Sequence, residues 1–195
     1  MFRRILINGV IAGLIVGLAS FSITVAMAGE PPALEYGMIF GYTSMLVALS
    51  FVFVGIKRHR DLDLGGVIRF WPALGMGLAI SFIASLFYVL AWEAAVAVSG
   101  LNFIDEYARF VIEQQKAQGA NAAALAKLSA EMEQFKLQYA NPFFRLPMTF
   151  AELFPVGVLV SAISAGLLRN HRFMPIRRSY LTPRRMSKQR SFRPP

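Results

Sequence analysis

The sequence predicts an all-α integral membrane protein: an antiparallel bundle of four membrane-spanning helices, with an external helical hairpin between the third and the fourth. Two observations predict this class. Hydrophobic residues make up 56% of the 195 residues and the mean hydropathy is +0.51, which is too apolar for an ordinary soluble domain. The apolar residues also gather in four segments, each long enough to cross a bilayer, which takes roughly 20 helical residues.

The four spanning helices are predicted near residues 5–28, 36–56, 70–98 and 147–168. The first also fits a cleaved signal peptide, because Met1-Phe-Arg-Arg4 precedes it and Ala26-Met27-Ala28 ends it. However, its apolar stretch is longer than the roughly 7 to 15 residues of a signal peptide. Gly9, Gly13 and Gly17 also form a stripe suited to close helix packing. We therefore expect this segment to stay in the protein as the first helix.

Lys and Arg residues are distributed unevenly between the connections. Fifteen of the twenty lie at the N-terminus, in the connection at 57–69 and in the tail from Arg169 onward. Basic residues accumulate on the cytoplasmic side of a membrane. This asymmetry predicts a multi-pass membrane protein with both termini in the cytoplasm, in agreement with an even number of crossings.

Small residues recur four apart in the other predicted helices as well. They are Gly37 and Gly41; Gly77, Ser81 and Ser85; and Gly157, Ser161 and Ala165. In lipid, close backbone approach along such stripes supplies much of the attraction between helices. The stripes favour a compact bundle, but they are equally suited to packing against a second copy of the chain in a homo-oligomer or against a membrane protein partner. The sequence does not show which stripes pack within the chain and which pack between chains.

The long connection at 99–146 predicts an external helical hairpin. Residues 118–121 offer a break in which Asn121 is suited to cap the second helix, and Asn141-Pro142 closes the hairpin. The second helix carries apolar residues at helical spacing: Leu125, Leu128, Met132, Phe135 and Tyr139. We expect the apolar faces to bury each other or to rest on the mouth of the bundle rather than to bind a partner.

The chain therefore divides into a membrane domain, 1–169, and a basic tail, 170–195. The tail combines basic residues and prolines without a carboxylate, so it is expected to be disordered in the cytoplasm. Its basic residues are suited to anionic lipid at the bilayer surface. Aromatic residues also alternate with arginine there, but we do not expect binding to nucleic acid.

Two carboxylates, Glu93 and Glu152, interrupt apolar segments and form the candidate intramembrane polar site. Both lie about five residues from the outer ends of their helices, which places them roughly 7 Å below the outer surface. Carboxylates in lipid should face the bundle interior or be protonated. One hypothesis is a pocket in which the pair binds a cation or shares a proton. The other is a structural hydrogen bond or ion pair for each carboxylate. The other members of the candidate site are Arg145, the obvious ion-pair partner, and Tyr42, Tyr88 and Trp92.

The remaining polar residues specify no chemistry, so we predict no catalytic, cofactor-binding or metal-binding residue and no cofactor. Asp61 and Asp63 lack a third ligand for a metal and are expected in a solvated loop. His59 and His171 lack the spacing of a zinc site. The chain also has no cysteine for a disulfide or a thiolate site.

Residues 41–61, 83–93 and 141–169 resemble the bacterial membrane family catalogued as domain of unknown function 4199. The resemblance runs from about Ile5 to Arg169 and includes both Glu93 and Glu152. It implies a four-helix inner-membrane protein with an external insertion, and it implies no assigned activity, substrate or catalytic residue. The tail extends beyond the family pattern.

The sequence favours a non-enzymatic binding, assembly or stress-related component of the membrane. The alternative is a small proton- or cation-coupled transporter or channel that uses Glu93 and Glu152. An intramembrane carboxylate supports the alternative, because such residues often line ion or proton pathways.

Overall fold

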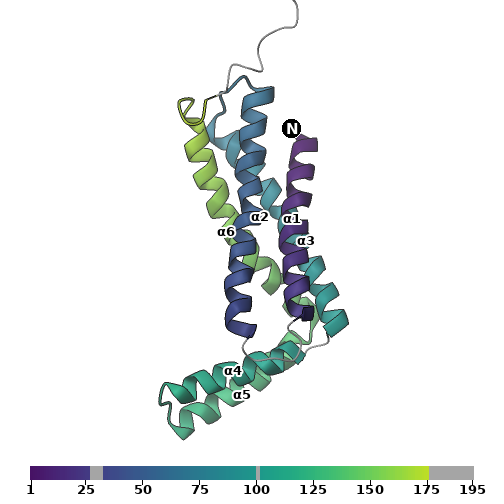
Figure 1. The fold of residues 1–195 in the computed structure, drawn as a ribbon, viewed down its shortest axis with the longest axis vertical. Coiled ribbons are helices and arrows are strands. Elements are labelled where there is room, and N and C mark those ends of the chain that lie inside the picture. Colours follow the sequence, from purple (N-terminus) through teal and green to yellow (C-terminus); the bar gives the residue numbers. More distant parts are fainter. Residues whose placement is uncertain (27–32, 100–101, 176–195) are drawn as a thin grey trace, which may run out of the picture.

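The computed structural model describes residues 1–26, 33–99 and 102–175, and all regular secondary structure in these residues is α-helical (Figure 1). The prediction of an all-α protein is confirmed. The helices are α1 (Phe2–Ala26), α2 (Ala33–Asp63), α3 (Phe70–Ser99), α4 (Asn102–Ala117), α5 (Ala122–Tyr139) and α6 (Pro142–Arg169). The candidate cleavage site at Ala28 and the tail residues 176–195 lie outside the described residues.

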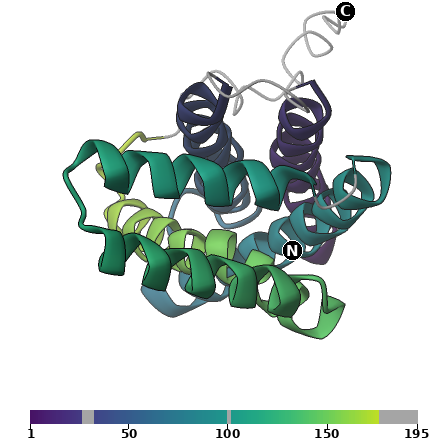
Figure 2. The same ribbon diagram turned by 90° about the horizontal axis from the view of Figure 1, so that it is seen from below.

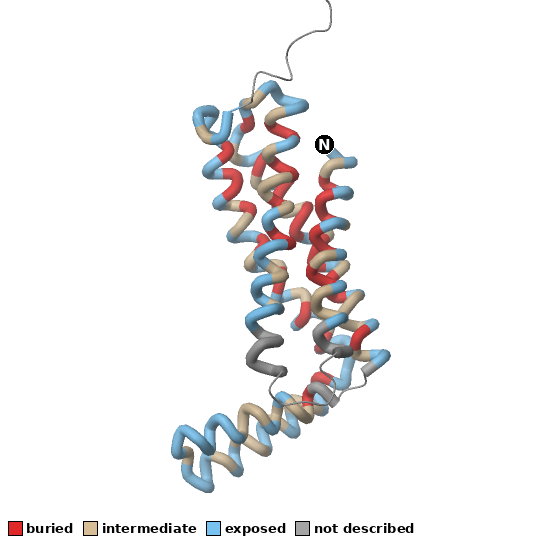
Figure 3. The backbone as a smooth tube through the Cα atoms, in the orientation of Figure 1, coloured by how far each residue is buried: buried red, intermediate tan, exposed pale blue. Residues whose placement is uncertain are grey.

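The four long helices run side by side, and α4 and α5 cross one end of them as a pair (Figures 1 and 2). We call this the hairpin end; the N-terminus and the last turn of α6 lie at the opposite, termini end (Figure 1). Helix α1 packs on α3 and α2, and α6 packs on α3 and α2. The buried residues are concentrated along the four long helices (Figure 3). The four helices are long and apolar enough to cross a membrane, within Phe2–Ser22, Ile39–Asp63, Phe70–Val98 and Pro142–Arg169.

Two helices extend further than the apolar segments that predict them. Helix α2 continues beyond residue 56 to Asp63, because hydropathy marks the depth of lipid and not the end of a helix. Helix α6 begins at Pro142 and not near 147. The side chain of Asn141 caps it by accepting a hydrogen bond from the backbone N–H of Phe143 at 3.0 Å, and proline is favoured in the first turn of a helix.

The glycine stripe of α1 lies against α3. A Cβ atom built on Gly9 would lie 2.8 Å from Cβ of Ile83, and one on Gly17 would lie 2.8 Å from Cβ of Ala91. Between them, Gly13 lies directly against the side chain of Phe87. The stripe therefore lets the two helices approach more closely than any larger residue would allow.

The small residues of α3 and α6 interlock in the same way. A Cβ atom on Gly77 would lie 2.8 Å from the side chain of Ser161, and one on Gly157 would lie 2.6 Å from that of Ser81. The hydroxyl oxygens of Ser81 and Ser161 are 3.3 Å apart and share a hydrogen bond. These stripes are therefore used inside the chain, whereas Gly41 on α2 has open space around it.

Candidate functional site

The first element of the candidate site is an ion pair between Glu93 of α3 and Arg145 of α6. Arg145 donates from Nε to Oε1 of Glu93 at 2.7 Å and from Nη2 to Oε2 at 2.6 Å. Its side chain is only 7% exposed, and that of Glu93 is 28% exposed. Two parallel charge-assisted hydrogen bonds fix both distance and orientation. The pair therefore joins the first turn of α6 to the hairpin end of α3.

Tyr139, the last residue of α5, is held by the same region. Trp92 Nε1 donates to the Tyr139 hydroxyl at 2.7 Å, and Arg145 Nη1 donates to the Tyr139 carbonyl at 3.2 Å. The guanidinium carbon also lies 5.8 Å from the centre of the tyrosine ring. Burial raises the pKa of the Tyr139 hydroxyl above its ordinary value. These contacts attach the hairpin to the bundle through α5, the second helix of the hairpin.

The second carboxylate, Glu152, has a different partner. The Tyr88 hydroxyl donates to Glu152 Oε2 at 3.0 Å, and Ser20 of α1 lies beside the same hydroxyl. Tyr88 is only 5% exposed, whereas Glu152 is among the exposed residues of α6. Its carboxylate thus meets a buried hydroxyl while the rest of the side chain opens to the outside of the bundle.

A buried hydroxyl completes this group. Thr149 is 1% exposed, and its Oγ1 lies against Tyr139 but makes no hydrogen bond of ordinary geometry with any described residue. Buried hydroxyls are nearly always paired, so an orphan of this kind needs an explanation. We call the whole group the hairpin-end polar cluster; its members are Ser20, Tyr88, Trp92, Glu93, Tyr139, Arg145, Thr149 and Glu152.

The charges of this cluster do not balance. It holds one cation, Arg145, and two carboxylates, and the cation is already engaged by Glu93 through two hydrogen bonds. Glu152 follows Arg145 by seven residues on α6, about 10 Å along the helix axis. Within the described residues, Glu152 forms no ion pair. The two carboxylates that the sequence presents as equivalent therefore differ in their surroundings.

The sequence-predicted site residues form two sets in the structure, and one residue lies outside both. Arg145 pairs with Glu93, Arg145 and Trp92 both donate to Tyr139, and Tyr88 contacts Glu152. Tyr42 of α2 joins neither set, since its side chain is 67% exposed. Sequence reasoning missed Tyr139 and Thr149 as members of the site. The only signal for Tyr139 was a polar tip at the end of the apolar stripe of α5.

A second polar group lies at the termini end. Arg4 of α1 donates from Nε and Nη2 to the carboxylate of Asp63 at 2.8 Å each, and Nδ1 of His59 lies 2.7 Å from the same carboxylate. The prediction of a solvated loop for Asp61 and Asp63 is wrong. Both residues lie in the last turns of α2, because ion pairs with neighbouring residues stabilise the polar end of this helix.

Arg60 is the centre of this second group, and it is completely buried. Its Nε donates to Asp61 at 2.7 Å, its Nη1 to the Phe173 carbonyl at 2.9 Å, and its Nη2 to the Met174 carbonyl at 2.7 Å. The Phe173 ring packs edge-on against Phe53 at 6.4 Å. Arg60 therefore holds the residues that follow α6 against α2. The sequence presents it only as one of several basic residues.

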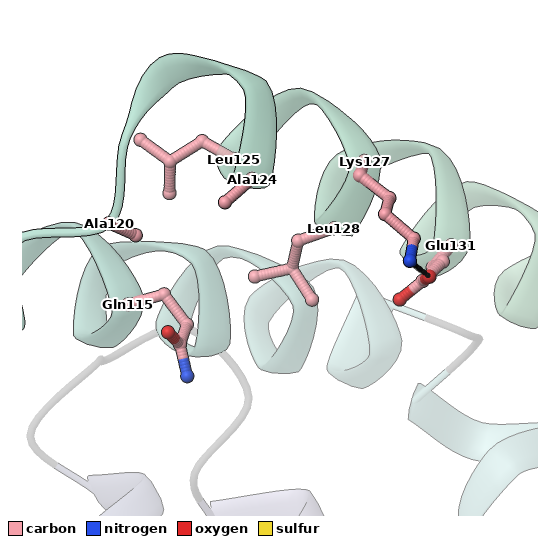
Figure 4. Close-up of a pocket in the computed structure, with 7 residues that line it drawn as sticks. All are labelled: Gln115, Ala120, Ala124, Leu125, Lys127, Leu128 and Glu131. Atoms are coloured by element: carbon pink, nitrogen blue, oxygen red, sulfur yellow. Dashed lines mark ion pairs between the residues drawn. The ribbon is translucent and has the colours of Figure 1, made fainter.

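A shallow surface depression of about 240 Å³ lies between the tips of α4 and α5 (Figure 4). Its lining residues are Gln115, Ala120, Ala124, Leu125, Lys127, Leu128 and Glu131. Lys127 and Glu131 form an ion pair of 3.8 Å along its edge. None of these residues belongs to the hairpin-end polar cluster. The described parts of the chain also bring together no three His, Cys, Asp or Glu residues that could hold a metal ion.

Comparison with known proteins gives one match. No curated protein and no solved structure matches the chain. The family described as "Protein of unknown function (DUF4199)" matches residues 8–170. The matched region contains every member of the hairpin-end polar cluster and ends just after α6. The chain therefore belongs to this family of proteins of unknown function.

Proposed function

We propose that the chain is a multi-pass protein of the bacterial inner membrane that acts as a non-enzymatic binding or assembly component, with the hairpin outside and both termini in the cytoplasm. The uneven distribution of basic residues supports this orientation, since most of the Lys and Arg residues in the described part of the chain lie at the termini end. The basic tail adds contact with anionic lipid on the cytoplasmic side.

The single observation that carries the binding role is the attachment of the hairpin. It crosses the end of the bundle and projects beyond it (Figures 1 and 2). Its inner end is fixed by the hydrogen bonds from Trp92 and Arg145 to Tyr139. Near this inner end it exposes large apolar side chains, with Leu137 75% and Tyr107 37% exposed. An arm that is rigid at its base and partly apolar at its surface is suited to a protein partner.

Photocrosslinking in intact cells tests this role. A photoreactive amino acid placed at Leu137 should give one adduct of defined mass, and the same amino acid at Leu62, which is 62% exposed at the termini end, serves as the control. A Tyr107→Ser change should reduce the adduct at 137. If position 137 gives only lipid adducts, or the same products as position 62, the binding role of the hairpin is wrong.

A second candidate function is a small proton- or cation-coupled transporter or channel. It is favoured by Glu152, which lies in a helix apolar enough to cross a membrane and has a tyrosine hydroxyl but no cation beside it among the described residues. Flux of protons or alkali cations into liposomes that contain the purified protein, with Glu152→Gln as the inactive variant, tests this candidate.

A further inference from the structure

We propose that Glu152, Tyr88 and Thr149 form a binding site for one monovalent alkali cation. The inference deepens the second candidate function, because it names the ligand of the same residues, but it requires binding only and not transport.

The charge count gives the first argument. Arg145 and Glu93 neutralise each other through two hydrogen bonds of 2.7 and 2.6 Å, so an ionised Glu152 leaves the cluster with one negative charge. The other members of the cluster are neutral: Ser20 from α1, Tyr88 and Trp92 from α3, Tyr139 from α5 and Thr149 from α6. Of these, Tyr88 donates a hydrogen bond to Glu152, and Tyr139 lies close enough to interact with its charge. An uncompensated carboxylate at this depth is costly, and a single positive charge restores balance.

The donor atoms give the second argument. Glu152 offers carboxylate oxygens, and Tyr88, which is 5% exposed, offers a hydroxyl 3.0 Å from one of them. Thr149 lies three residues before Glu152, almost one turn of α6, so the two side chains lie on neighbouring positions of one face. Its Oγ1 is the orphan hydroxyl of the cluster. These donors are all oxygens, which are the ligands of hard cations.

The backbone of α6 adds a further oxygen at the same level. Pro155 lies inside the helix and has no N–H, so the carbonyl of Ala151 loses its intrahelical donor. In transport proteins, carbonyls freed from helical hydrogen bonding at helix breaks coordinate Na⁺. Pro155 frees one such carbonyl, although α6 continues as a helix beyond it. A single carboxylate with neutral oxygens matches one positive charge, whereas a divalent ion would normally have more than one carboxylate.

The test uses the full-length protein in detergent, with Trp71→Phe so that Trp92 is the sole tryptophan. Trp71 is 76% exposed at the termini end of α3, whereas Trp92 donates a hydrogen bond within the cluster. NaCl or KCl is exchanged for choline chloride at constant ionic strength and pH 8. We expect a saturable change in Trp92 emission with Na⁺ or K⁺ that choline does not produce.

Variants of the three ligands locate the site. Glu152→Gln should abolish the response, and Thr149→Val and Tyr88→Phe should each weaken the affinity about tenfold, as expected for the loss of one oxygen ligand. Glu113→Gln, on the exposed surface of α4, should leave it unchanged. The two milder variants remain informative if Glu152→Gln does not fold.

Several results would overturn the inference. They are a wild-type protein without a saturable response, an unchanged response in folded Glu152→Gln, or unchanged affinity in both Thr149→Val and Tyr88→Phe. A response to pH alone, with none to Na⁺ or K⁺, would replace the cation with a proton and overturn the inference. Intact cation binding without flux into liposomes would remove the second candidate function and leave the cation site in place.

Discussion

Arg145 and Glu93 close α6 onto α3 with two hydrogen bonds of 2.7 and 2.6 Å. The same guanidinium donates to the carbonyl of Tyr139 at 3.2 Å, so one side chain connects two bundle helices and the hairpin. This residue thereby links the stability of the bundle to the position of the hairpin.

Breaking this ion pair on one side should destabilise the protein more than removing it completely. We expect Arg145→Met to lower the free energy of unfolding by roughly 3 kcal/mol, because it leaves a partly buried carboxylate without its partner. We expect a loss at the lower end of the range for removing one partner of a buried ion pair, because the Glu93 side chain is 28% exposed. The double variant Glu93→Leu with Arg145→Met should recover part of the loss. Unfolding in mixed micelles measures these free energies. The prediction would be contradicted if the double variant lost as much free energy of unfolding as the two single variants lose together.

A methyl group on the α1 stripe should separate α1 from α3. Gly13→Ala places a Cβ atom against Phe87, so we expect a loss of about 1 to 3 kcal/mol in the free energy of unfolding. Gly166→Ala on α6 is the matched control, because no atom lies within 4 Å of the added Cβ. The control should be neutral or slightly stabilising. Equal thermal stabilities for the two variants would show that the close contact between α1 and α3 is wrong.

Arg60 should control the segment that follows α6. Replacing it with methionine removes the donors to the carbonyls of Phe173 and Met174. We expect faster amide hydrogen exchange over residues 170–174 and little change within α3. Arg60→Lys, which retains the charge but not the forked donors, should show a similar increase. Unchanged exchange in both variants would mean that Arg60 does not hold this segment.

The base of the hairpin should weaken at alkaline pH. The hydrogen bond with Asp105 raises the pKa of Lys136, and burial raises that of Tyr139. A raised pKa gives stability that is complete below the ordinary values of 10.5 and 10.0 and is lost as the pH rises beyond them. The midpoint temperature of thermal unfolding, followed by circular dichroism, should therefore fall above about pH 10. Asp105→Asn should show a shallower fall, and identical pH profiles would contradict this account.

The sequence predicts the described helices well, because their signals are local. Asn121 caps α5 as expected, with its side chain accepting from the N–H of Ala124 at 2.8 Å. The end of α2 was missed because polar residues 57–63 continue the helix through ion pairs that hydropathy does not register. The start of α6 has a local signal in Asn141-Pro142, whereas the apolar segment that follows predicts a boundary near residue 147.

The candidate site was predictable only in part. The depth of a residue in the membrane follows from its distance in sequence from the end of its helix, but the side chains that it contacts depend on how each helix is rotated about its axis. Counting places Glu93 and Glu152 at one level, and it also places Tyr42 there. The rotation of α2 turns Tyr42 outward, and the packing of α3 on α6 gives the two carboxylates different partners. Likewise, the direction in which Arg60 points depends on where α6 ends, more than one hundred residues later.

The most direct test of the account is the sidedness of the two ends in intact cells. The chain has no cysteine, so single cysteines can be added without background. Ala126→Cys lies on exposed α5, and Leu64→Cys lies at the termini end, where Leu64 is 45% exposed. A membrane-impermeant maleimide should label position 126 in spheroplasts and position 64 only after the membrane is opened. Labelling of position 64 in intact spheroplasts, or of position 126 only after opening, would contradict the proposed membrane protein with an external hairpin.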